Sequence, residues 1–165
     1  YRALAAPAMI DHLRRLGVGP DRVVGIYLER SAEAVIALLA ILKAGGAYLP
    51  LDASFPADRV AFILGDADVG IVLTDSACVD GLPAFDGKTI LLDRFWPESA
   101  AEPATPPSPC NDIADLGLLL YTSGSTGSPK GVEITHAGLI NNVSFWDETH
   151  GLSAASGAIS APATR

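Results

Sequence analysis

Residues 116–131 read LGLLLYTSGSTGSPKG, and the fold class follows from this stretch. Its first part, LGLLLY, is a continuous apolar run, which is typical of a strand in the interior of a sheet. A loop of glycine, serine and threonine residues comes next, and then a short β-type segment at residues 131–134. Open α/β sheets bind ligands at the carboxyl ends of their strands, so this loop occupies a position where a binding site is expected.

Strand and helix patterns alternate on either side of this stretch. Short apolar segments rich in β-branched residues predict strands at residues 22–28, 69–74 and 88–92, with a short extended piece at residues 47–51. Apolar residues at helical spacing, together with capping residues, predict helices at residues 1–16, 31–44, 56–66 and 136–147. This alternation indicates an α/β fold with a mainly parallel sheet flanked by helices.

Several local signals sharpen these predictions. Ser31 is a good N-cap and Gly45-Gly46 a good terminator for a helix that is apolar almost all round, so we expect that helix to be deeply packed. Pro50 has no amide N–H, so the pairing of the extended piece should be interrupted or lie at an edge. Thr135 can cap the last helix, and the proline-rich residues 96–111 predict an irregular connection.

Composition limits the classes of protein that this chain can belong to. It has 165 residues, of which 49% are apolar and 18% charged, so we expect one domain with a substantial core. A net charge of −8 argues against nucleic acid or an anionic membrane as a partner bound through a broad basic surface. The longest apolar run, residues 34–42, is far shorter than the roughly 20 residues that span a bilayer. Cys78 and Cys110 form no CxxC pair, so we expect free thiols, no metal site and a cytoplasmic location.

The loop at residues 121–131 has the composition of an anion site. Its glycines allow close backbone approach, so successive N–H groups can point into one concavity. Its hydroxyl groups add donors that rotate to meet phosphate oxygens, and Lys130 adds a full positive charge. The alternative interpretation of the loop is a flexible surface turn.

Two other well-known loop motifs do not match residues 121–131. A Walker loop opens into a helix, whereas here a proline and a β-type segment follow the glycines. The GxSxG pattern of a hydrolase elbow is absent, which argues against Ser123 or Ser125 as a nucleophile.

YTSGSTGSPKG resembles the phosphate-loop signature of the adenylate-forming (AMP-binding) enzymes. A second block, LKAGGAYLPLD at residues 42–52, is similar to a motif of adenylation domains from nonribosomal peptide synthetases. The FPADR sequence at residues 55–59 and Thr135-His136 continue the similarity, which is collinear over essentially the whole chain. The resemblance implies that residues 1–165 are a partial adenylation domain, an N-terminal fragment holding the incomplete start of the large N-terminal subdomain.

The resemblance also implies a reaction. An amino acid and ATP would give aminoacyl-AMP and pyrophosphate, with Mg²⁺ assisting. The aminoacyl group would then pass to the phosphopantetheine thiol of a peptidyl carrier protein, next to condensation domains of the same assembly line. The residues carried over as the loop around the β- and γ-phosphates are Thr122, Ser123, Gly124, Ser125, Thr126, Gly127 and Lys130. The catalytic lysine, the acidic magnesium ligand and the residues that select the amino acid are expected beyond residue 165, so the fragment alone is expected to be inactive.

Two alternatives stay open. One is an aryl-acid or acyl-CoA-type ligase of the same superfamily, against which the LKAGGAYLPLD block counts. The other is a non-enzymatic module that binds nucleotide phosphates. Structural roles are expected for Lys43 and Asp52, and a capping or packing role for His136.

Overall fold

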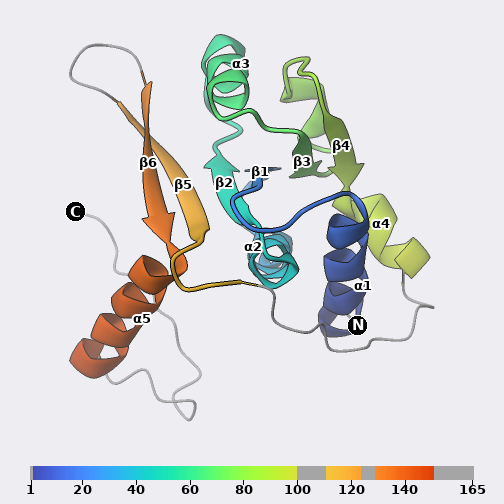
Figure 1. Ribbon diagram of the computed structural model, residues 1–165. Helices are drawn as coiled ribbons and strands as arrows, with labels where there is room; N and C mark the ends of the chain where they lie inside the picture. Colours follow the sequence, from blue (N-terminus) through green and yellow to red (C-terminus); the bar gives the residue numbers. More distant parts are fainter. Residues whose placement is uncertain (1, 100–110, 124–128, 151–165) are drawn as a thin grey trace.

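A computed structural model describes residues 2–99, 111–123 and 129–150 and confirms the mainly parallel sheet (Figure 1). The sheet has six strands in the order β4-β3-β1-β2-β5-β6. All neighbouring strands run parallel except β5 and β6, which form an antiparallel pair. The strands are β1 (Val23–Tyr27), β2 (Ala47–Leu51), β3 (Ile71–Thr74), β4 (Lys88–Leu91), β5 (Leu116–Ser123) and β6 (Pro129–Thr135).

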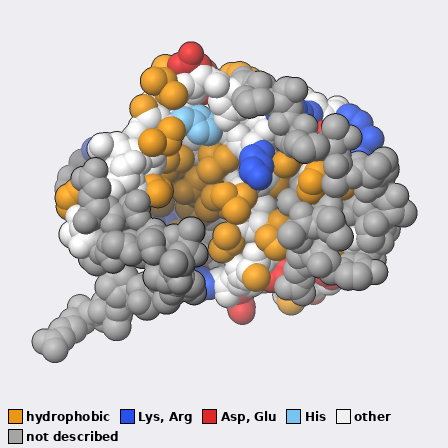
Figure 2. Space-filling model, turned by 90° about the horizontal axis from the view of Figure 1, so that it is seen from below, with side chains coloured by type: hydrophobic (Ala, Val, Ile, Leu, Met, Phe, Trp, Pro, Cys, Tyr) orange, Lys and Arg blue, Asp and Glu red, His pale blue; other side chains and the backbone are white. Residues whose placement is uncertain are grey.

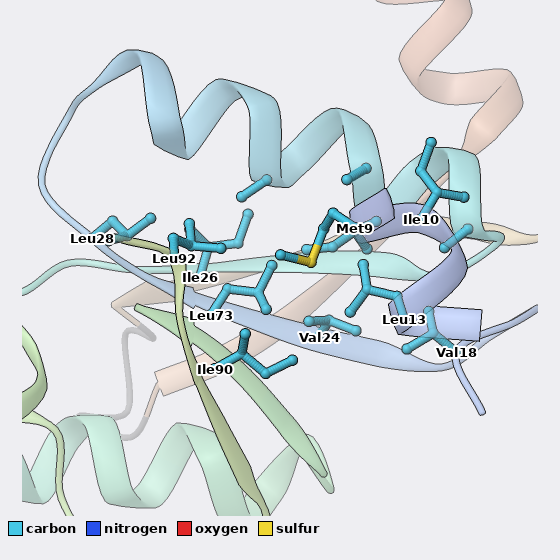
Figure 3. Close-up of a cluster of buried hydrophobic side chains, with 14 residues drawn as sticks. Met9, Ile10, Leu13, Val18, Val24, Ile26, Leu28, Leu73, Ile90 and Leu92 are labelled. Atoms are coloured by element: carbon cyan, nitrogen blue, oxygen red, sulfur yellow. The ribbon is translucent and has the colours of Figure 1, made fainter. Parts of the chain in front are cut away.

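Helices cover both faces of the sheet. They are α1 (Arg2–Arg15), α2 (Ala32–Ala44), α3 (Ala57–Asp66), α4 (Leu92–Ser99) and α5 (His136–His150), with a 3-10 turn, η1 (Val79–Gly81). Because side chains alternate along a strand, Val24 and Ile26 of β1 lie on one face and Tyr27 lies on the other. The first face packs against α1, α2 and α4 (Figure 3), and the second packs against α3.

The ends of α2 form as predicted. The Ser31 hydroxyl accepts a hydrogen bond from the Ala34 amide at 3.2 Å, and Gly45 ends the helix at φ +104°. Gly46 is needed for a different reason, because a Cβ there would lie 2.6 Å from Val18 Cγ1 and 2.9 Å from the Arg22 carbonyl oxygen. The chain therefore passes tightly from α2 into β2.

One prediction about this region is corrected, and one of two alternatives is decided. α2 is not packed on all sides, since Val35 is 57% exposed and Leu39 is 48% exposed. The reason is that α1 and the sheet cover one side of the helix and leave the other open. β2 lies inside the sheet and not at its edge. It pairs with β1 along its whole length, including Pro50, but its register with β5 is limited to Tyr48 and Leu118, so the predicted interruption occurs on the β5 side alone.

A further correction concerns the proline-rich segment. The predicted irregular connection begins at residue 96, but α4 continues through Pro97 to Ser99. Burial stabilises this helix, because Phe95 and Trp96 pack against the core cluster and the Phe95 ring lies 5.1 Å from the ring of His12. Residues 100–110, including Cys110, lie outside the described residues.

The side of the molecule that holds α1, α2 and α5 carries exposed apolar side chains. Figure 2 shows them gathered on the face seen from below. On α5 the exposed fractions reach 57% for Ile140, 67% for Val143 and 60% for Phe145. Within residues 2–99, 111–123 and 129–150, no helix has the length and apolar character needed to cross a membrane.

Candidate functional site

The predicted phosphate loop connects β5 to β6 at the end of an antiparallel hairpin. Thr122 lies opposite Lys130, and Ser123 lies opposite Pro129. β5 therefore extends two residues beyond the predicted strand end at residue 121, and β6 begins at residue 129 instead of 131. Four of the seven predicted loop residues, Gly124, Ser125, Thr126 and Gly127, lie outside the described residues.

The structure places Thr122 and Lys130 together but separates Ser123 from them. Residues directly opposite each other in an antiparallel pair project to the same face, so the Thr122 hydroxyl and the Lys130 side chain share a face of the hairpin. Ser123 follows Thr122 directly and projects to the other face. All three residues are exposed.

The face that carries Thr122 and Lys130 suits an anion. Leu120 and Val132, the next residues of the hairpin on that face, are an apolar pair. Glu133 lies opposite Leu119 and projects to the other face, towards α3. A hydroxyl donor and a cation thus stand at the hairpin end with no carboxylate beside them on this face of the described strands. This donor set fits a phosphate group.

The carboxyl ends of β1 and β2 lie at the same edge of the sheet as the end of β5. A surface hollow there is lined by Leu28, Glu29, Arg30, Asp52, Ala53 and Ser54. Asp52 Oδ1 accepts hydrogen bonds from the Ser54 amide at 2.8 Å and the Ser54 hydroxyl at 2.7 Å. These hydrogen bonds, with a smaller effect of Arg30, lower the pKa of Asp52. Asp52 therefore stabilises a turn, the structural role expected for it.

A hydrogen bond between β5 and α3 was not predicted from the sequence. The Tyr121 hydroxyl donates a hydrogen bond of 2.5 Å to Asp66 Oδ2, at the last residue of α3. Burial, and then Asp66, raise the pKa of Tyr121 above its usual range. Tyr121 stands within the quoted motif, but no local pattern connects it to a carboxylate 55 residues away.

His136 has the packing role expected for it. Its Nε2 lies 2.9 Å from Nδ2 of Asn111, whose side chain also donates to the Leu42 carbonyl at 2.9 Å. The start of α5 is thereby joined to the end of α2. Thr135 caps α5 as predicted, because its hydroxyl accepts a hydrogen bond from the Gly138 amide at 3.3 Å.

Acidic and sulfur-containing side chains are dispersed over the described part of the chain. No group of three or more His, Cys, Asp or Glu residues is arranged there to hold a metal ion. Cys78 is a free thiol whose pKa is raised, mainly by burial. The magnesium expected from the resemblance therefore has no assembled ligand set in residues 2–99, 111–123 and 129–150.

This chain is similar to several known proteins. Chondramide synthase cmdD of Chondromyces crocatus is 50% identical over 130 residues, which cover 78% of this chain and 3% of that protein. The crystal structure of the nonribosomal peptide synthetase FmoA3 in its α-methyl-L-serine-AMP-bound form matches with 34% identity and a TM-score of 0.78, over 89% of this chain and 16% of that one. NpsA-ThdA of Klebsiella oxytoca, an artificially fused adenylation-PCP di-domain, matches with 27% identity and a TM-score of 0.71, over 82% of this chain and 26% of that one.

The chain thus spans a small part of each of these relatives, while the relatives cover most of the chain. The fold is shared with the nonribosomal peptide synthetase structures. The model of the family described as "AMP-binding enzyme" matches residues 4–161, nearly the full length. The chain therefore belongs to the AMP-binding enzyme family.

Proposed function

We propose that this chain forms the first part of an adenylation domain that activates an amino acid for nonribosomal peptide synthesis. In the proposed reaction a carboxylate oxygen of the amino acid attacks the α-phosphorus of ATP. The bond from that phosphorus to the bridging oxygen breaks, which gives aminoacyl-AMP and releases pyrophosphate. The aminoacyl adenylate in the FmoA3 structure, α-methyl-L-serine-AMP, supports an amino acid as the substrate class.

The observation that carries the proposal is the pairing of Thr122 with Lys130 at the exposed end of the hairpin. Pyrophosphate gains negative charge as it leaves, and a preorganised hydroxyl and ammonium group would stabilise that charge. In this proposal Thr122 and Lys130 contact the β- and γ-phosphates from one face of the hairpin. The other residues carried over by the resemblance complete the site, Ser123 from the opposite face and Gly124, Ser125, Thr126 and Gly127 from the loop. Mg²⁺ would neutralise further phosphate charge, with its protein ligands in another part of the domain.

The proposed partners follow from the same relatives. NpsA-ThdA joins an adenylation domain to a PCP domain in one chain, which supports a peptidyl carrier protein as the acceptor. The acceptor group would be the phosphopantetheine thiol of that carrier, with condensation domains acting next in the assembly line. A cytoplasmic location stays a prediction.

Exchange of labelled pyrophosphate into ATP tests the proposal. The complete adenylation domain that contains this chain would be supplied with ATP, Mg²⁺, pyrophosphate and one acid at a time. We expect exchange with one or a few amino acids and none with aryl or fatty acids. Exchange with aryl or fatty acids alone would assign the chain to the other ligases of the superfamily. ATP binding without exchange for any acid would favour a non-enzymatic module.

A further inference from the structure

The end of the β5–β6 hairpin has little support from the rest of the sheet. β5 is in register with β2 at Tyr48 and Leu118, and residues 119–123 are paired with β6. Figure 1 shows the hairpin at one side of the molecule, with its far end extending away from β2. A two-stranded hairpin is marginally stable by itself, so contacts outside the sheet must hold its end in place.

The Tyr121–Asp66 hydrogen bond supplies such a contact. Asp66 belongs to α3, whose position is set by the burial of Val60, Ile63 and Leu64, each at most 2% exposed. Tyr121 packs at the border of the same cluster and reaches Asp66 with its hydroxyl. A hydrogen bond to an ionised carboxylate is stronger than one between neutral groups.

Gly131 makes room for this arrangement. It lies opposite Tyr121 in β6, and a Cβ at this position would lie 3.3 Å from the Tyr121 ring. The phenol ring can therefore lie against the neighbouring strand while its hydroxyl group reaches α3. The next pair towards the loop is Thr122 and Lys130, so the contact acts one residue away from the proposed phosphate ligands.

We propose that Tyr121 and Asp66 are positioning residues for the triphosphate of ATP. Their hydrogen bond joins the hairpin end to α3 and so fixes where Thr122 and Lys130 meet the phosphates. This inference rests on the proposed function and adds to it a pair of residues that touches neither the nucleotide nor the amino acid.

The test is steady-state exchange kinetics on the complete adenylation domain. Tyr121→Phe removes the donor and leaves the ring, and Asp66→Ala removes the acceptor. We expect each to raise KM for ATP by roughly tenfold, in line with the loss of one charge-assisted hydrogen bond, with KM for the amino acid unchanged. The double variant should be little worse than either single variant, because both remove the same interaction.

Two further variants separate positioning from folding. Asp66→Asn keeps an acceptor oxygen but loses the charge, so KM for ATP should rise less than in Asp66→Ala. Tyr48→Phe is the matched control. Tyr48 is a half-buried tyrosine on β2, and its hydroxyl has no hydrogen-bond partner among the described residues, so KM for ATP should not change.

Each contrary result has a definite meaning. An unchanged KM for ATP in both Tyr121→Phe and Asp66→Ala would overturn this inference and leave the proposed function intact. Equal losses for ATP and the amino acid would assign the pair to folding and also overturn it. A wild-type domain without exchange for any acid would instead overturn the proposed function, and this inference with it.

Discussion

Replacing Lys130 with alanine should weaken the binding of ATP without changing the stability of the folded domain. Lys130 is exposed on β6 opposite Thr122, and it has no ion-pair partner within the described ranges. Its truncation should therefore change the free energy of unfolding by less than about 0.5 kcal/mol. If its ammonium group binds a phosphate oxygen, the lost charge-assisted hydrogen bond costs roughly 1.5–3 kcal/mol. Since about 1.4 kcal/mol corresponds to a factor of ten, KM for ATP should rise roughly ten- to 150-fold.

Pyrophosphate exchange over a range of ATP concentrations measures that rise, and thermal unfolding of the same samples measures stability. Lys88→Ala is the matched control, because Lys88 is an exposed lysine on β4, at the opposite edge of the sheet from β6. It should leave both KM and the melting temperature unchanged. A normal KM for ATP in Lys130→Ala would refute the proposed phosphate contact. A large fall in melting temperature would refute the description of Lys130 as a side chain without a structural role.

Three further predictions concern the fold. Gly46→Ala should lower the free energy of unfolding by about 1–3 kcal/mol, because the added Cβ would meet Val18 and the Arg22 carbonyl. Gly19→Ala is the control, because the space around Gly19 is open. Equal melting temperatures for the two variants would contradict the tight passage of the chain at Gly46. Ser31→Ala should lower the free energy of unfolding by about 1 kcal/mol, because the hydrogen bond that caps α2 is lost, and Ser31→Thr should lower it much less. Equal values for the two variants in urea unfolding would show that the cap does not stabilise the helix. The exposed apolar face of α5 should make isolated residues 1–165 prone to aggregate, and Val143→Glu, which interrupts that face, should lower their light scattering. Unchanged scattering would show that this face is not responsible.

The sequence by itself determined those features whose causes lie within a few neighbouring residues. Ser31 accepts from an amide three positions later, and Gly45 adopts a backbone angle that other residues rarely take, so both ends of α2 could be predicted. Short apolar runs predicted the strands, and their alternation with helices predicted that the sheet is mainly parallel. The loop motif, with its specific order of glycines, hydroxyls and Lys130, indicated the family that the comparison then established.

Tertiary structure decided the features that depend on which distant segments meet. α4 persists through Pro97 because Phe95 and Trp96 find the core near α1, which no pattern around residue 96 indicates. Strand register places Thr122 with Lys130 on one face of the hairpin and sends Ser123 to the other, although the motif presents all three as one loop. Tyr121 reaches Asp66 across 55 residues because the strand order brings β5 near the end of α3. Such contacts depend on the packing of the whole sheet, and local propensity carries no information about them.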